Sequence, residues 1–289
     1  MYQIVTDSCC DIPFQLLEEA GVAYIPMFVE MDGKEYIDDL GKTFDYENFL
    51  EKIKANHQAK TSQINVGRYV EFFRPYVEKK IPILYLAFSS GMSGSYNSAL
   101  QAVALLEEEY EQPQIRVVDT LAASAGEGLL VIEAQKRQAA GQTLDEVAEW
   151  VEDAKMRLHS WVTVDDLKHL ERGGRISKTA AAVGGLLNVK PIIHVDESGH
   201  LQNVDKVRGR NKSLQKVADE TINHLTSTED QIIYIAYSGD RQSAEKVAEL
   251  LKQKITISDL KLLPLGPTIA SHTGYGCIAV FSFGTVRKD

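Results

Sequence analysis

The stretch ILYLAF at residues 83–88 runs directly into the polar stretch SSGMSGS at residues 89–95. An unbroken apolar run of this length is typical of a strand buried on both faces of a parallel sheet. Beyond the polar stretch, Ala99, Val103 and Leu106 recur at spacings of four and three, which is one face of an amphipathic helix. A buried strand, a polar turn and a helix in this order predict an α/β unit.

The rest of the first half repeats this alternation. We expect further short buried strands at residues 2–6, 23–29 and 115–118. Asp45 is placed to cap a helix over residues 46–53, and the Asp32-Gly33 pair predicts a small hairpin. Strands that alternate with helices favour a parallel sheet covered by helices on both faces, a three-layer domain.

The second half has a different pattern. Strands are predicted at residues 160–164, 189–195, 201–207, 232–237 and 278–283. A turn at residues 197–199 makes a hairpin, and helical stripes cover residues 214–225 and 244–251. Hairpins mixed with helices indicate an α+β domain. We therefore expect an α/β domain over residues 1–158 and an α+β domain over residues 159–289.

The composition is that of a globular protein. The chain has 289 residues, of which 44% are apolar and 25% charged, which corresponds to roughly two domains. No apolar run approaches the ~20 residues that a membrane-spanning helix needs. The first residues lack the basic and apolar segments of a signal peptide, so a cytoplasmic location is expected, with at most transient contact with a membrane surface.

Several classes of partner and cofactor are not expected. The net charge of −10 argues against nucleic acid, because its binding depends on neutralising phosphates. Cys9, Cys10 and Cys277 form neither a zinc-binding spacing nor a disulfide framework, which fits a reducing compartment. The sequence has no P-loop, dinucleotide fingerprint or HExxH motif, so we expect no cofactor and no metal.

Four polar segments lie where loops would leave the predicted strands. They are Thr6-Asp7-Ser8, Thr61-Ser62-Gln63, residues 89–95 and Asp119-Thr120. Ligands of open α/β sheets bind at the carboxyl ends of the strands, where hydroxyls and free amides at a helix N-terminus make an anion site. Helix capping alone would account for the first segment, but residues 89–95 hold more hydroxyls and glycines than one cap requires.

An enzymatic alternative rests on the same polar stretch. Residues 91–95 resemble the G-x-S-x-G nucleophile elbow, with Ser95 in place of the last glycine. His272 lies among small residues and glycines in a segment expected to be a loop, and it would be the base. The alternative is therefore a lipid-directed serine hydrolase that uses Ser93 and His272, although no acidic third member is evident.

Two basic segments stand out in this acidic chain. Residues 170–178 include Arg172 and Arg175, and residues 207–212 include Arg208, Arg210 and Lys212. Together they would form a local positive face for an anionic group or an acidic partner. The alternative is an ordinary solvated surface.

Taken together, the motifs resemble the DegV family, the fatty-acid-binding proteins also known as FakB. The matching segments are Thr6-Asp7-Ser8 with Asp11-Ile12-Pro13, Thr61-Ser62-Gln63, residues 89–96, Gly173-Gly174-Arg175-Ile176-Ser177, Lys190-Pro191, and Gly266-Pro267 with His272-Thr273-Gly274. They follow the order of the family and span nearly the whole chain. The family commonly has Lys where this chain has Arg172, and the charge is kept.

The resemblance implies a two-domain protein that holds one long-chain fatty acid in a tunnel between its domains. In the family the carboxylate is held by residues that match Thr61 and Ser93, with His272 nearby, and we include Ser62, Gly94 and Ser95 in the expected site. The family passes its acid to a separate ATP-dependent fatty acid kinase, which makes an acyl phosphate for phospholipid synthesis. The protein would then be a substrate-binding subunit and not an enzyme, with Arg172, Arg175, Arg208 and Arg210 docking the kinase.

This implied function agrees with the chemistry of the residues. An acyl chain gains about 0.8 kcal/mol for each buried CH₂ group, but its carboxylate is costly to bury without partners. Hydroxyls and amides would satisfy the carboxylate. Because histidine titrates near neutral pH, we expect binding to depend mildly on pH between about 5 and 8 through His272.

Overall fold

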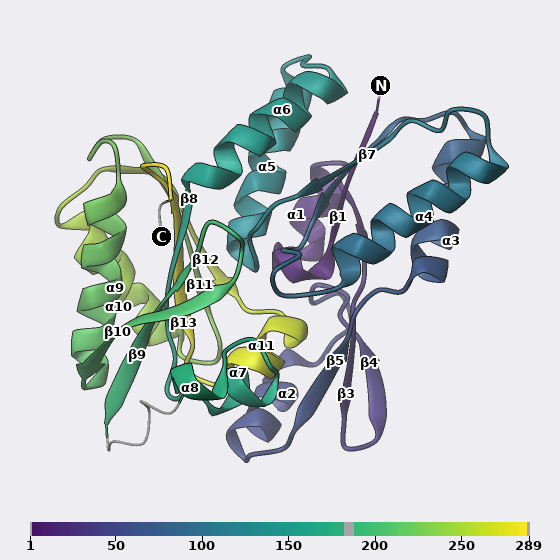
Figure 1. The fold of residues 1–289 in the computed structure, drawn as a ribbon. Coiled ribbons are helices and arrows are strands. Elements are labelled where there is room, and N and C mark those ends of the chain that lie inside the picture. The colour runs from purple at the N-terminus through teal and green to yellow at the C-terminus, as the bar shows by residue number, and fades with distance from the viewer. Residues whose placement is uncertain (1, 182–187, 288–289) are drawn as a thin grey trace.

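The computed structural model describes residues 2–181 and 188–287, and its amino-terminal half is built on a parallel sheet. The strands are ordered β2 (Ala23–Ile25), β1 (Gln3–Asp7), β6 (Ile83–Ala87) and β7 (Ile115–Asp119). All three pairings are parallel, so the expected α/β unit around residues 83–95 is confirmed (Figure 1). The central strands β1 and β6 deliver their polar continuations to the same edge of the sheet.

Helices cover both faces of this sheet. One face carries α3 (Val66–Glu78) and α4 (Ser95–Glu109), whose buried side chains include Tyr69, Phe73 and Leu106. The opposite face carries α5 (Ala125–Ala139) and α6 (Leu144–Ala154). The short η1 (Ser8–Cys10) and α1 (Phe14–Glu19) follow β1 directly.

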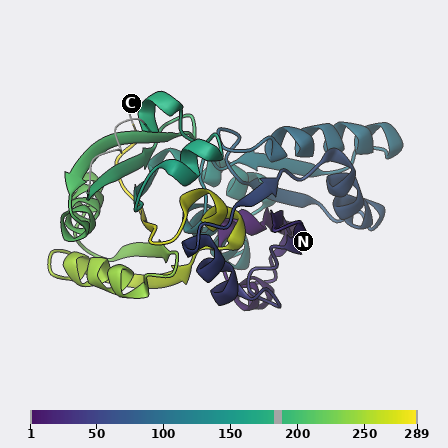
Figure 2. The ribbon, with the colours of Figure 1, turned by 90° about the horizontal axis from the view of Figure 1, so that it is seen from below.

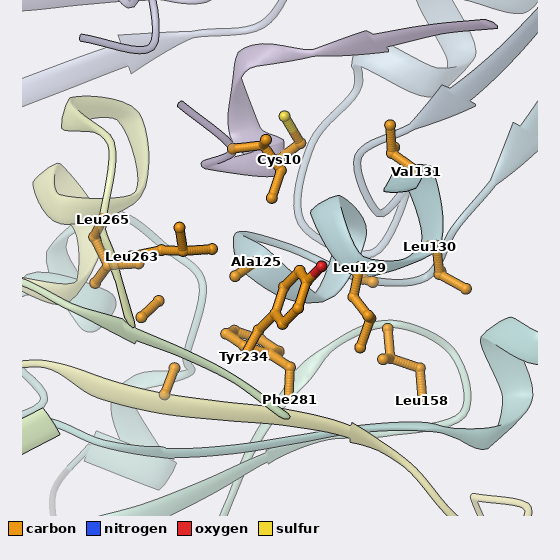
Figure 3. Packing of buried hydrophobic residues seen from close by; sticks show 14 of the residues in the cluster. Cys10, Ala125, Leu129, Leu130, Val131, Leu158, Tyr234, Leu263, Leu265 and Phe281 are labelled. Atoms are coloured by element: carbon orange, nitrogen blue, oxygen red, sulfur yellow. The ribbon is translucent and has the colours of Figure 1, made fainter. Parts of the chain in front are cut away.

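Helix α5 is the central element of the molecule. Residues 125–131 are all buried, a pattern of a helix that is packed on every side. The cluster in Figure 3 shows why: Leu129 contacts a group that includes Cys10 from the first half and Phe281 from the second. One continuous apolar core therefore joins the two halves of the chain.

A small antiparallel sheet extends from the first half. It consists of β4 (Lys34–Ile37), β3 (Phe28–Met31) and β5 (Ala59–Ser62), and α2 (Tyr46–Lys54) begins after the cap that Asp45 provides to Asn48. The hairpin at Asp32-Gly33 is confirmed. The prediction of one strand over residues 23–29 is wrong, because Pro26, which cannot donate a ladder hydrogen bond, ends β2 and the chain enters a different sheet.

The second half forms a six-stranded mixed sheet. Its order is β10 (Leu201–Arg208), β9 (Val189–Val195), β8 (Leu158–Thr163), β13 (Ile278–Phe283), β11 (Gln231–Tyr237) and β12 (Ile257–Pro264). The hairpin β9–β10 and the mixture of strands and helices agree with the expected α+β pattern. Strand β12, which pairs in parallel with β11, was not predicted.

The two faces of this sheet meet different neighbours. Trp161, Ile192 and Val280 pack with α9 (Arg210–His224) and α10 (Arg241–Lys252) on the outer face. Since side chains alternate along a strand, the neighbouring Val162, Ile193 and Phe281 face inward toward the first half. Figure 1 shows α9 and α10 on the outside of the sheet, away from α5.

Three short helices lie between the six-stranded sheet and the small antiparallel sheet (Figure 1). They are α7 (Lys168–Arg172), α8 (Lys178–Ala181) and α11 (Pro267–Thr273), with η2 (Lys155–Arg157) leading into β8. Although α11 comes late in the sequence, it contacts η1, α2, β3 and β5 of the first half. Figure 2 shows α11 in yellow where the two lobes meet. The segment was expected to be a loop, because a single short helix between Gly266 and Gly274 offers too few turns for a periodic pattern.

Candidate functional site

The main cavity lies between the inner face of the six-stranded sheet and the carboxyl edge of the parallel sheet. It contains about 840 Å³ of space not filled by atoms, part of which is open to solvent. Most of its lining residues are apolar: Met27, Phe88, Met92, Ala123, Val162, Leu170, Ile193, Val195, Leu201, Leu265, Ile269, Cys277, Ala279 and Phe281. The alternation of β8, β9 and β13 produces this wall, because every second side chain of each strand faces inward.

The polar side chains of the cavity gather around α11. Thr61, Ser62, Gln63, Ser93, Arg175 and His272 line it there. The Oγ1 atom of Thr61 lies 2.7 Å from Nε2 of His272, a contact between residues 211 positions apart. The fold thus brings together three segments that the sequence singled out separately: residues 61–63, residues 89–95 and the segment around His272.

Thr61 and Ser62 occupy a strand and not the expected loop. They are the last residues of β5, where Thr61 pairs with Val29 and Ser62 with Phe28 of β3. The sheet fixes the backbone, so the Thr61 side chain is held in a defined direction. The strand was not predicted because β5, with the sequence AKTS, has few of the β-branched or aromatic residues that indicate a strand.

His272 is held in a neutral state. Burial, followed by the positive charge of Arg175 and by His169, lowers the pKa of His272 to about 4. Its Nδ1 atom is buried, has no hydrogen-bond partner among the described residues and lies against Gly173, where an added Cβ atom would come within 2.2 Å of it. In the ligand-free protein burial therefore favours the neutral imidazole, whereas the expected pH dependence concerns the protein with a carboxylate beside the ring and stays a prediction.

The polar stretch after β6 has two kinds of serine. Ser93 lines the cavity, and its Oγ atom lies 2.9 Å from Oγ of Ser95 and accepts from the Ser95 amide. Ser95 is fully buried behind it, where its hydroxyl accepts from the Ile64 amide. Gly94 caps α4, and a Cβ atom there would lie 2.1 Å from Oε1 of Gln63. Ser95 and Gly94 thus fasten residues 89–95 to residues 63–64 and do not themselves line the cavity.

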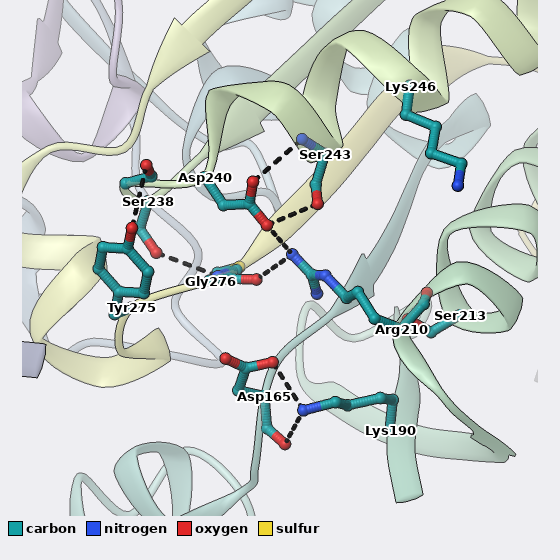
Figure 4. A network of polar contacts seen from close by, with 12 residues as sticks. Asp165, Lys190, Arg210, Ser213, Ser238, Asp240, Ser243, Lys246, Tyr275 and Gly276 are labelled. Atoms are coloured by element: carbon teal, nitrogen blue, oxygen red, sulfur yellow. Dashed lines mark hydrogen bonds and ion pairs between the residues drawn. The ribbon is translucent and has the colours of Figure 1, made fainter. Parts of the chain in front are cut away.

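The four arginines predicted to dock a partner are divided by the fold. Arg175 lines the cavity, and its Nε donates to the Met92 carbonyl at 3.0 Å. Arg172 is exposed and donates to Nδ1 of His169, and Arg208 is exposed at the end of β10. Arg210 is held in a network shown in Figure 4, where it donates to Asp240 at 3.3 Å and to the Gly276 carbonyl at 2.6 Å.

The hydrolase alternative finds no support in this geometry. A nucleophilic serine must contact its base, and the base must contact an orienting carboxylate. His272 instead contacts Thr61, the Ser93 hydroxyl contacts Ser95, and the remaining ring nitrogen of His272 has no partner. Among residues 2–181 and 188–287, no catalytic triad is assembled around Ser93.

The described residues hold no cluster of three or more ligating side chains suited to a metal ion. Within residues 2–181 and 188–287, none of the helices combines the length and apolar character that crossing a membrane requires.

The sequence reasoning missed several lining residues. Ser124, Ser160 and Thr268 line the cavity and belong to none of the predicted site segments, and Arg175, which was predicted to dock the kinase, lines it as well. The Gly173-Gly174 pair could have indicated that Arg175 lies at the site, because glycine lets the backbone approach another group closely. In the structure the backbone of Gly173 packs against His272. Ser124 and Thr268 gave no signal, since isolated hydroxyl residues are common as helix caps.

Comparisons with known proteins give one consistent family. The model of the DegV family, described as uncharacterised proteins, matches residues 1–285. A DegV domain-containing protein of Clostridium perfringens is 41% identical over 287 residues, which is 99% of each chain. The crystal structure of a DegV family protein from Ruminococcus gnavus, refined with vaccenic acid, has a TM-score of 0.87 at 30% identity and covers 97% of this chain and 99% of that one. The Streptococcus pneumoniae Fatty Acid Kinase (Fak) B3 protein, loaded with linoleic acid, shares the fold with a TM-score of 0.86 at 22% identity, over 99% of this chain and 100% of that one.

Proposed function

Because the chain belongs to the DegV family, we propose that it binds one long-chain fatty acid in its main cavity. The observation that carries the proposal is one cavity with a long apolar wall and a polar group at α11. The Ruminococcus gnavus protein, whose structure contains vaccenic acid, supports the choice of ligand. The carboxyl group would lie at Thr61, Ser93 and His272, and the acyl chain along the inner face of the six-stranded sheet.

The proton positions favour carboxylate binding. Nδ1 of His272 meets no acceptor, so the proton of the neutral ring belongs on Nε2, where Oγ1 of Thr61 accepts it. The Thr61 hydroxyl proton is then free to point at a carboxylate oxygen. Ser93 offers a second hydroxyl, and the guanidinium of Arg175 supplies a positive charge to the same cavity. Charge-assisted hydrogen bonds of this kind offset the cost of burying a carboxylate.

The apolar wall supplies most of the affinity. Each buried CH₂ group contributes about 0.8 kcal/mol, so a chain of about sixteen carbons gains on the order of 10 kcal/mol before the costs of association. The polar group contributes a smaller share of the total affinity, but it distinguishes the acid from its ester and fixes which end of the ligand faces the α11 end of the cavity.

The first experiment is to identify the bound lipid. Protein purified from a bacterial host is extracted and analysed by mass spectrometry, and delipidated protein is titrated with palmitate, oleate and methyl palmitate. We expect a co-purified fatty acid and much weaker binding of the ester, which keeps the chain but lacks the carboxylate. Equal binding of acid and ester would contradict the polar assignment, and no binding of either would contradict the function.

The finer part of the proposal is that the bound acid is presented to an ATP-dependent fatty acid kinase in the cytoplasm for acyl-phosphate formation. The name of the Streptococcus pneumoniae protein supports a kinase system as the setting. Arg172 and Arg208 are the exposed candidates for docking in this acidic protein. The test mixes the loaded protein, ATP and the kinase subunit of a bacterial fatty acid kinase, and measures acyl phosphate. No product with any such kinase would contradict this part alone.

A further inference from the structure

The amino-terminal end of α11 is held by carboxylates from the other half of the chain. Asp11 accepts from the Gly266 amide at 2.9 Å, a contact across 255 positions. Asp38 accepts from the Thr268 amide at 3.3 Å and from the Thr268 hydroxyl at 2.5 Å. Gly266, the cap residue of α11, makes no side-chain capping hydrogen bond of its own. The amides of this helix end therefore donate to side chains from the segments that follow β1 and β4.

Both carboxylates are out of contact with water. Asp38 is fully buried, and Asp11 is 3% exposed. A Cβ atom at position 266 would lie 2.5 Å from Oδ1 of Asp11 and 3.4 Å from Oδ2 of Asp38. Burying a carboxylate costs free energy unless the group is hydrogen-bonded. Two buried carboxylates packed against the backbone of Gly266 therefore restrict the position of this end of α11.

The same carboxylates reach the cavity wall. The second oxygen of Asp11 accepts from the Ser124 hydroxyl at 2.6 Å. Ser124 lines the cavity, and its backbone has φ 55° and ψ −146°, a region that non-glycine residues occupy at a cost. Thr268 and Leu265, on either side of Gly266, line the cavity as well. Asp11 thus connects two cavity walls, and Asp38 fixes the helix that forms one of them.

We propose that Asp11 and Asp38 are positioning residues of the binding site, which seat α11 so that His272 meets Thr61. The proposal rests on the proposed fatty-acid function for its binding consequence. Thr268 and His272 are four positions apart, so they lie about one helical turn from each other on the same side of α11. A shift of the helix at Thr268 is therefore carried to the imidazole, whose 2.7 Å contact with Thr61 tolerates little movement.

The test separates positioning from general stability. Asp38→Ala removes the contact with α11, and Thr268→Val removes the hydroxyl with little change in shape. Thr268→Ser keeps the hydroxyl and is the rescue. Asp39→Ala is the matched control, because the neighbouring Asp39 accepts from the Thr43 amide and hydroxyl and makes no contact with α11.

Two readouts are needed for each variant. The first is the imidazole NMR signal of His272 in the ligand-free protein, and the second is the affinity for oleate. We expect Asp38→Ala and Thr268→Val to shift the His272 signal and to weaken oleate binding by roughly tenfold or more, because a displaced His272 no longer orients the Thr61 hydroxyl and one hydrogen bond to the carboxylate is lost. Thr268→Ser and Asp39→Ala should behave like the parent protein.

The outcomes are distinguishable. An unchanged His272 signal and unchanged affinity in folded Thr268→Val would overturn the proposal, even if Asp38→Ala does not fold. An equal shift in the Asp39→Ala control would overturn it too, since the effect would then be general. If the parent protein binds no fatty acid but the His272 signal still moves in Asp38→Ala, the proposed function fails and the positioning role stands.

Discussion

Replacing Thr61 by valine tests the proposed grip on the carboxylate most directly. Valine keeps the β-branched shape that suits β5 and its pairing with Val29, so the strand should persist. The change removes the hydroxyl that contacts His272 and leaves Nε2 of that ring without its partner. A hydrogen bond to a charged group contributes about 1.5–3 kcal/mol, which predicts oleate affinity roughly 10- to 150-fold weaker.

The assay is isothermal titration of delipidated protein with oleate at pH 7.5, with circular dichroism to confirm the fold. Thr163→Val is the matched control, because Thr163 is a strand threonine like the half-buried Thr61 but is fully buried in β8, outside the lining of the cavity. Its hydroxyl finds no hydrogen-bond partner in the part of the chain that the structure describes, so the control should bind normally and be at least as stable as the parent. Equal oleate affinity for Thr61→Val and the parent would refute the carboxylate assignment.

Three further predictions concern other residues. Ser93→Ala should weaken oleate binding less than Thr61→Val in the same titration, because the Ser93 hydroxyl is already engaged with Ser95; a larger loss would contradict this order. Burial raises the pKa of Asp38 to about 6, so the folded state binds this proton more tightly than the unfolded chain. The contribution of Asp38 to unfolding free energy should fall by about 3 kcal/mol as pH rises from about 4 to about 6 and then level off. Urea unfolding at several pH values over this range checks it, and Asp38→Asn should reduce the fall of unfolding free energy with pH. Burial also raises the pKa values of the carboxyls of Asp11 and Glu127, so these two groups add to the fall in the parent protein. Arg172→Glu should leave oleate binding near normal while acyl-phosphate formation with the kinase falls, and the difference from the parent should be largest at low salt and shrink at high salt, because salt screens exposed charges; loss of both would show that the residue supports the fold.

The strand and helix pattern could largely be predicted from the sequence where apolar residues repeat. The stretch 83–88 and the stripe that follows became β6 and α4, and the hairpin β9–β10 formed where its turn residues stand. The errors have local causes. Pro26 divided one apolar run between two sheets, and β5 was missed because it is polar and held by pairing with β3.

The site was harder to predict than the fold. Hydroxyl-rich segments pointed to Thr61 and Ser93, both of which line the cavity. Their contact with His272 depends on how α11 is seated, and this comes from partners hundreds of positions away. The protonation state of His272 depends on burial and on Arg175, neither of which a residue pattern reports.

The long separation of these contacts has a consequence for synthesis. The Asp11–Gly266 and Thr61–His272 contacts join residues 255 and 211 positions apart, so neither exists until nearly all of the chain has left the ribosome. Contacts of such high sequence separation form late and slow folding. Until then, the six-stranded sheet also lacks β13, which lies between β8 and β11, so the apolar side chains of its earlier strands are open to aggregation with other nascent chains. The ability to hold a lipid and the completion of folding are thus acquired in the same step, and a chain that stops short of α11 would have neither.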